Sequence, residues 1–126
     1  MAMPKPDDRT RQLFQAVLPE DPRVQTRPMF GNLAAFVNGN MFAGLFGNDL
    51  FVRLPEDDRA ALLGEPGGHL LEPMAGRPMR EYVVLPQAWQ GQPERLHEWL
   101  RRGLNWTATL PSKAPKRPKA GRKNSR

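Results

Sequence analysis

The stretch 26-TRPMFGNLAAFVNGNMFAGLFGNDLFVRL-54 decides the fold class. It contains three apolar runs that are too short for helices and long enough for strands: Leu33–Val37, Met41–Phe46 and Leu50–Leu54. The runs are joined by two short segments rich in Asn and Gly, which tolerate the positive φ angles of hairpin turns: Asn38-Gly39-Asn40 and Gly47-Asn48-Asp49. Strands joined by such tight turns must be antiparallel neighbours. The stretch therefore predicts a three-stranded meander.

A helix is predicted before the meander, over residues 7–18. Asp7 or Asp8 can cap its free N–H groups, and Pro19 ends it because a proline nitrogen cannot donate a hydrogen bond. We interpret residues 19–28 as a connection.

After the meander, residues 55–64 predict a short helix that opens on three carboxylates and closes at Gly64. A loop over 64–69 follows. Leu70-Leu71 begins a fourth strand, 73–78 turns the chain, and 80–85 forms a fifth strand.

The last helix starts at Pro93, since proline suits a first helical position. Glu98 and Arg102 stand at i,i+4 spacing in the favourable order, and Gly103 is predicted to terminate the helix. The element order is α-βββ-α-ββ-α. We therefore expect an α+β fold, a two-layer α/β sandwich with helices on a five-stranded antiparallel sheet.

The residues Met29-Phe30-Gly31 stand at the entrance to the meander. We predict that Met29 and Phe30 start the first strand and fill the core, and that Gly31 permits a bulge or a close backbone approach. The alternative is a shallow pocket at that edge. Core packing likewise explains four apolar residues of the strands, which could instead line a binding groove or a dimer face: Met41, Phe42, Phe46 and Phe51.

The net charge of +6 belongs to the end of the chain. Residues 111–126 hold seven of the 19 basic residues and no acidic one, whereas residues 1–110 hold the other 12 and all 13 acidic residues. We therefore predict a nearly neutral domain over 1–110 and a disordered basic tail over 111–126.

The sequence gives no indication of an N-terminal signal peptide or a membrane span. It begins without an apolar leader-like run, and no apolar run approaches about 18 residues. There is no cysteine, so no thiolate metal site is available. We expect a soluble, cytoplasmic protein with no membrane contact.

The residues that could carry chemistry are few. Ser112 and Ser125 lie in the basic tail, and His69 and His97 lack metal-ligand spacing. The acidic run 56–58 suits the positive end of a helix. We expect no enzyme activity, no metal and no cofactor. The alternative is an enzyme that combines carboxylates with an arginine, for which the candidates are Arg27, Arg77 and Arg80.

Several motifs together resemble the N-terminal domain of TfoX/Sxy-type competence regulators, over about residues 8–105. They are Met29-Phe30-Gly31, the run Leu33–Val37, Asn38-Gly39, Met41-Phe42-Ala43, Leu50-Phe51-Val52, Met79-Arg80-Glu81-Tyr82, and a last helix with Glu98-Trp99 and Arg101-Arg102. The resemblance implies a two-layer α/β sandwich and a non-enzymatic regulatory protein, with a protein partner or self-association. Longer members carry a second, helical domain, so this chain looks like a short form with a basic tail in its place.

The tail suggests a second function. Its basic residues can neutralise phosphates with little sequence preference: Lys113, Lys116, Arg117, Lys119, Arg122, Lys123 and Arg126. The tail has no aromatic residue for stacking on bases, so we expect no base recognition. The alternatives are a non-specific nucleic-acid-associated protein and a solubilising tail without a partner. The two functions can coexist, with the domain bound to a protein and the tail to DNA.

Overall fold

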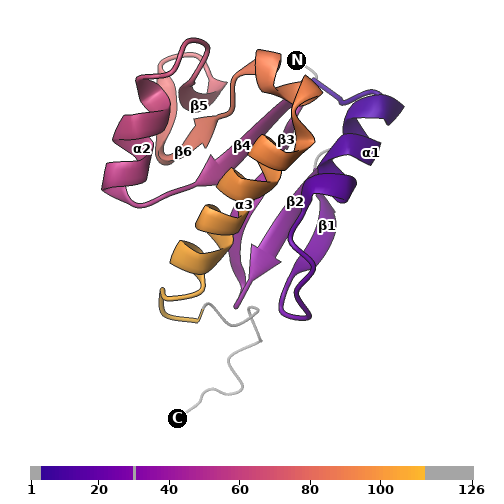
Figure 1. Cartoon of the computed structure of the whole chain (residues 1–126), viewed down its shortest axis with the longest axis vertical. Coiled ribbons are helices and arrows are strands. Elements are labelled where there is room, and N and C mark those ends of the chain that lie inside the picture. The colour runs from indigo at the N-terminus through magenta and orange to yellow at the C-terminus, as the bar shows by residue number, and fades with distance from the viewer. Residues whose placement is uncertain (1–3, 30, 113–126) are drawn as a thin grey trace.

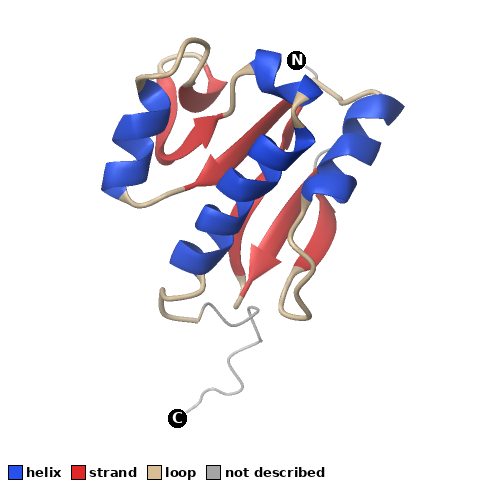
Figure 2. Ribbon diagram, in the orientation of Figure 1, coloured by secondary structure: helices blue, strands red, loops and turns tan. Residues whose placement is uncertain are grey.

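The computed structural model describes residues 4–29 and 31–112. Three helices cover one face of an antiparallel sheet, which makes two layers (Figures 1 and 2). The helices are α1 (Asp8–Val17), α2 (Glu56–Leu63) and α3 (Pro93–Thr107), with a 3-10 helix, η1 (Gln87–Gly91), before α3. The strands are β1 (Gln25–Met29), β2 (Asn32–Val37), β3 (Asn40–Phe46), β4 (Asp49–Arg53), β5 (His69–Met74) and β6 (Arg77–Val84). This confirms the predicted fold class and layering.

The sheet has six strands in the order β1-β2-β3-β4-β6-β5, and not the five predicted. The additional strand is β1, which lies largely in the segment 19–28 that we interpreted as a connection. Its sequence is polar, contains Pro28 and leaves four of five residues exposed, so it shows no alternation of apolar and polar residues. It becomes a strand because its backbone pairs with β2, from Gln25 opposite Phe36 to Met29 opposite Asn32.

Gly31 has a different role from the predicted one. Met29 pairs with Asn32, so Gly31 lies in the tight turn between β1 and β2, where its φ of +83° disfavours any side chain. Met29 ends β1 and does not start the first strand of the meander, and it lies outside the main core. Phe30 lies outside the described residues.

A bulge instead occurs between β2 and β3. Ala35 pairs with Ala43 and Phe36 pairs with Met41, so Phe42 is the extra residue. The bulge turns both Phe42 and Ala43 toward the helices and leaves Met41 on the other face of the sheet. Two consecutive residues of β3, Phe42 and Ala43, therefore face the same side of the sheet.

The hairpin of β5 and β6 is longer than predicted. Its strands run through the segment 73–78 that we predicted as a turn, and Met74 pairs with Arg77. The ladder passes from Leu70–Val83 directly to Leu71–Met79, so residues 80–82 of β6 form a wide bulge. This shift sets the outer part of the hairpin, residues 71–79, apart from the regular ladder. We call these residues the hairpin tip.

The last helix extends past Gly103, so the predicted termination there is wrong. Gly103 is buried inside α3, where a β-carbon would lie 2.3 Å from Val52 Cγ2 and 2.9 Å from the Arg53 carbonyl oxygen. The glycine is required because the helix packs closely on β4. The predicted pair of Glu98 and Arg102 is confirmed, with an N–O distance of 3.0 Å.

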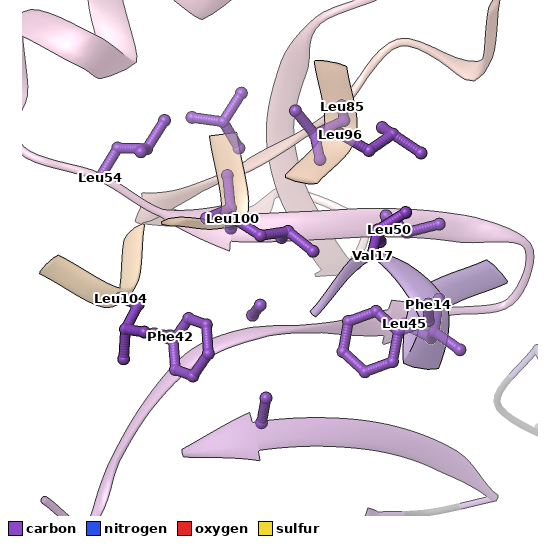
Figure 3. Close-up of a cluster of buried hydrophobic side chains, with 14 of the residues drawn as sticks. Phe14, Val17, Phe42, Leu45, Leu50, Leu54, Leu85, Leu96, Leu100 and Leu104 are labelled. Atoms are coloured by element: carbon purple, nitrogen blue, oxygen red, sulfur yellow. The ribbon is translucent and has the colours of Figure 1, made fainter. Parts of the chain in front are cut away.

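The main core lies between the helices and the sheet (Figure 3). Phe14 and Val17 of α1 and Leu96, Leu100 and Leu104 of α3 are almost fully buried. They pack against sheet residues that include Phe42, Leu45, Leu50 and Val52. No helix in the described ranges has both the length and the apolar character that a bilayer span needs.

Candidate functional site

A second apolar cluster lies on the face of the sheet that carries no helix. Val52 and Val83 pair with each other and point into the main core. Their strand neighbours Phe51 and Val84 also pair, and since adjacent residues of a strand face opposite ways, they point away from the helices. Phe51, Val84 and Leu71 are buried there, and four partly buried side chains pack against them: Met41, Phe46, Met79 and Tyr82. We call these seven residues the open-face cluster.

Five residues of the open-face cluster line a pocket of about 240 Å³. The end of β1, the middle strands and the hairpin tip all contribute to its wall, so elements from both ends of the sheet meet at one hollow. The lining residues are Met29, Asn32, Leu33, Ala34, Met41, Leu45, Phe46, Phe51, Leu71, Pro73 and Met79. We call this hollow the apolar pocket.

Small residues on β2 and β3 make room for the aromatic wall. Gly44 pairs with Ala34 on one side and with Phe51 on the other. A β-carbon on Gly44 would lie 2.5 Å from Phe51 Cζ, so the phenyl ring occupies the space that any side chain at Gly44 would need. Phe51 then meets Tyr82 edge to face, with ring centroids 5.7 Å apart.

The polar groups around the apolar pocket are already engaged. The Asn32 amide donates from Nδ2 to the Pro4 carbonyl oxygen at 2.9 Å, and its Oδ1 accepts from the Gly47 N–H at 3.1 Å. The Tyr82 hydroxyl donates to the Met41 carbonyl oxygen at 3.0 Å, and burial raises the pKa of Tyr82. The pocket therefore offers apolar contact and no uncommitted polar side chain among its lining residues.

Two arginines at the rim of the apolar pocket stack on aromatic rings, on the face of the sheet that carries no helix. The Arg27 guanidinium lies 4.5 Å from the centre of the Phe36 ring, and Arg53 lies 5.8 Å from that of Tyr82 while pairing with Glu81. Arg77 and Arg80 are exposed on β6. The structure gives no ion pair between Arg27, Arg77 or Arg80 and a carboxylate within residues 4–29 and 31–112.

The family-motif residues that the structure describes lie in turns, at the apolar pocket and in the main core. Asn38 and Gly39 form the β2–β3 turn with φ angles of 53° and 78°, as the sequence predicted. Met29 and Met41 line the apolar pocket, which agrees with the alternative of a pocket at that edge. Phe42 lies in the main core. Phe46 and Phe51 also line the pocket, so the expectation of simple core packing was incomplete for them.

The residues considered for catalysis have structural contacts. His97 Nδ1 lies 2.9 Å from the Val17 carbonyl oxygen, and His69 Nδ1 lies 3.1 Å from the oxygen of its neighbour Leu70. Asp58, in the first turn of α2, accepts from Arg102 at 3.2 Å. Over the described part of the chain, no group of three or more His, Cys, Asp or Glu residues could hold a metal ion.

The basic tail falls almost entirely outside the described residues, as do its seven candidate nucleic-acid-binding residues, Lys113 to Arg126. Its root is visible. Asn40 Nδ2 donates to the Pro111 carbonyl oxygen at 3.0 Å, and the Ser112 hydroxyl donates to that of Asn38 at 3.5 Å. The β2–β3 turn thus fixes the point from which the tail departs.

Sequence reasoning missed the contribution of the hairpin tip to the pocket. Pro73 and Met79 lay in or beside the segment interpreted as a turn. The sequence did contain one indication. In 71-LEPMAGRPM-79 a Pro-Met pair stands on each side of the short segment Ala75-Gly76-Arg77, and a short segment with glycine between two similar runs is typical of a hairpin.

The TfoX N-terminal domain model matches residues 9–106. The chain belongs to the TfoX N-terminal domain family. The match ends just before the tail, and it covers all six strands, which build the apolar pocket. No curated protein and no solved structure matches the chain.

Proposed function

We propose that this TfoX-like domain is a non-enzymatic regulatory domain that binds a protein partner through the open face of its sheet. The observation that carries the proposal is the open-face cluster itself. Its Met41, Phe46, Met79 and Tyr82 are only partly buried, and Met74 at the hairpin tip is 66% exposed. Partly exposed apolar side chains gathered on one face are typical of protein–protein contact sites.

The chemistry of the face supports binding over catalysis. None of the residues that line the apolar pocket has a titratable side chain. Acid–base catalysis needs such a group within reach of the substrate. The rim carries Arg27 and Arg53, and aromatic residues, Met and Arg are the residue types enriched in interfaces.

The proposal is tested by site-specific photo-crosslinking in the native host. A photoreactive amino acid is placed at position 74 and, in a matched control, at position 63 on α2, where Leu63 is also exposed. We expect a discrete cross-linked product from position 74 only, either with another protein or with a second copy of the chain. The same products from both positions, or none from position 74, would contradict the proposal.

Nucleic-acid association through the tail is the second candidate function. The concentration of seven basic residues and no acidic one in 111–126 favours it. The test is fluorescence anisotropy with a labelled duplex of about 20 base pairs across a salt series. The intact chain is compared with a 1–112 truncation, which keeps the contacts of Pro111 and Ser112 with the β2–β3 turn.

Salt-sensitive binding that is lost on truncation would support a domain tethered to nucleic acid by its tail. Equal binding by both proteins would show that the tail is not responsible.

A further inference from the structure

We propose that the apolar pocket is a ligand site for a small, uncharged, apolar molecule, such as a substituted benzene or a short branched hydrocarbon. This goes beyond the proposed function, because the ligand occupies the hollow within the face and is bound by the isolated domain. The composition of the pocket wall, the size of the pocket and the hairpin tip beside it support this proposal.

The wall selects against charge and against hydrogen-bonding groups. Ten of the eleven lining residues are apolar, and the eleventh, Asn32, has both ends of its amide in hydrogen bonds to Pro4 and Gly47. A charged or strongly polar ligand would lose its hydration without gaining a partner from these side chains. An apolar ligand loses nothing of that kind and gains contact with the apolar wall.

The size of the pocket sets the size of the ligand. An apolar cavity of roughly 150 Å³ holds one benzene molecule. A hollow of about 240 Å³ therefore has room for a molecule of roughly ten non-hydrogen atoms. Water is a poor occupant, because an ordered water needs two or more polar partners and the committed Asn32 offers none.

The wall is also adaptable. All four methionines in residues 4–29 and 31–112 lie at the pocket or on the hairpin tip: Met29, Met41, Met74 and Met79. Methionine is unbranched and flexible, so a methionine-rich wall adjusts to ligands of different outline. The site thus fits a class of apolar molecules better than one shape.

The hairpin tip is the mobile part of the wall in this proposal. Leu71, Pro73 and Met79 contact the pocket, and the wide bulge at residues 80–82 separates them from the main ladder. A ligand in the pocket gains contact with the tip and holds it against the sheet. Bound ligand should therefore slow amide exchange in residues 71–79.

The test uses the full chain with 13C-labelled methionine methyl groups, titrated with toluene and, separately, with benzoate as its charged counterpart. We expect toluene to shift the signals of Met29, Met41 and Met79 with saturation. Benzoate should shift none of the three. Hydrogen exchange of residues 71–79 is measured with and without toluene.

Two variants locate the site. Ala34→Leu adds three carbons inside the pocket and should weaken toluene binding by at least about tenfold. Met79→Gln places an amide in the half-buried wall and should do the same, which keeps the test valid if Ala34→Leu does not fold. Leu63→Ala, on the exposed surface of α2, should bind toluene like the natural chain.

The proposal is overturned if the folded protein shows no saturable methionine shift up to the solubility of toluene, or if benzoate binds as tightly. It is also overturned if Ala34→Leu and Met79→Gln bind toluene unchanged. The titration needs no partner protein. A failure of toluene to bind would therefore not contradict a cross-linked product from position 74, and the absence of that product would not contradict toluene binding.

Discussion

At the scale of single residues, glycines decide how closely the layers and strands can approach. Gly103 lies where α3 crosses β4, and Gly44 lies beneath the Phe51 ring. Both have ordinary φ angles, so the reason for glycine is space and not backbone conformation. Sequence patterns do not reveal such contacts, because they depend on which surface packs against the glycine. For that reason Gly103 was mistaken for a helix terminator.

In Gly103→Ala the added methyl overpacks against Val52 and the Arg53 carbonyl, which costs about 1–3 kcal/mol. Alanine gains roughly 1 kcal/mol over glycine in a helix, so we expect a net loss of stability of up to about 2 kcal/mol. The measurement is the free energy of unfolding in urea. Gly91→Ala is the control, since a β-carbon there meets no atom within 4 Å, and a loss as large as that of Gly103→Ala would contradict this explanation.

The capping carboxylate of α1 makes stability depend on pH. The Thr10 backbone N–H donates to Asp7 at 2.8 Å, and this hydrogen bond lowers the pKa of Asp7. A lowered pKa in the folded state means that the carboxylate stabilises the fold above the unfolded value near 3.8, and that this contribution is lost as pH falls.

The thermal midpoint of Asp7→Asn should therefore fall less between pH 6 and pH 3 than that of the natural chain. Midpoints that fall in parallel for the two proteins would contradict this role of Asp7.

At the scale of elements, the strands of the meander and the helices α1 and α3 were predictable because each buries an apolar face that leaves a pattern in the sequence. Helix α2 buries only Leu62 and was predictable from its acidic first turn and from Gly64. β1 and the hairpin tip were not, for the opposite reason. β1 is an exposed edge strand of mixed composition that depends on pairing with β2. The hairpin tip depends on a bulge that shifts its register, and the shift decides which side chains reach the pocket.

The hairpin tip should open independently of the main core. Leu71 is 3% exposed and joins the tip to the open-face cluster, so Leu71→Ala removes its main apolar anchor. We expect a loss of about 2–4 kcal/mol in global stability and a larger relative increase in amide exchange for residues 71–79 than for β3. Exchange followed by mass spectrometry distinguishes this from uniform loosening, which would contradict a separate hairpin unit.

At the scale of the whole molecule, one sheet serves two purposes. Its helix-covered face builds the core that stabilises the domain (Figure 3), and its open face carries the apolar pocket and its partly exposed rim. The sequence predicted the first face almost completely. It predicted the second only as an alternative, since an apolar residue of a strand looks the same whether it fills a core or lines a pocket. The bulge at Phe42, which sends Met41 to the pocket, has no signature in the sequence.

The central claim is that this domain acts by binding through its open face. The most direct test compares Met74→Asp with Leu63→Asp, two exposed apolar residues that receive the same charge on different surfaces. Affinity for the partner captured from position 74 is measured by calorimetry for both variants. We predict a loss of at least about tenfold for Met74→Asp and none for Leu63→Asp. Unchanged affinity for Met74→Asp, or equal losses for both variants, would contradict it.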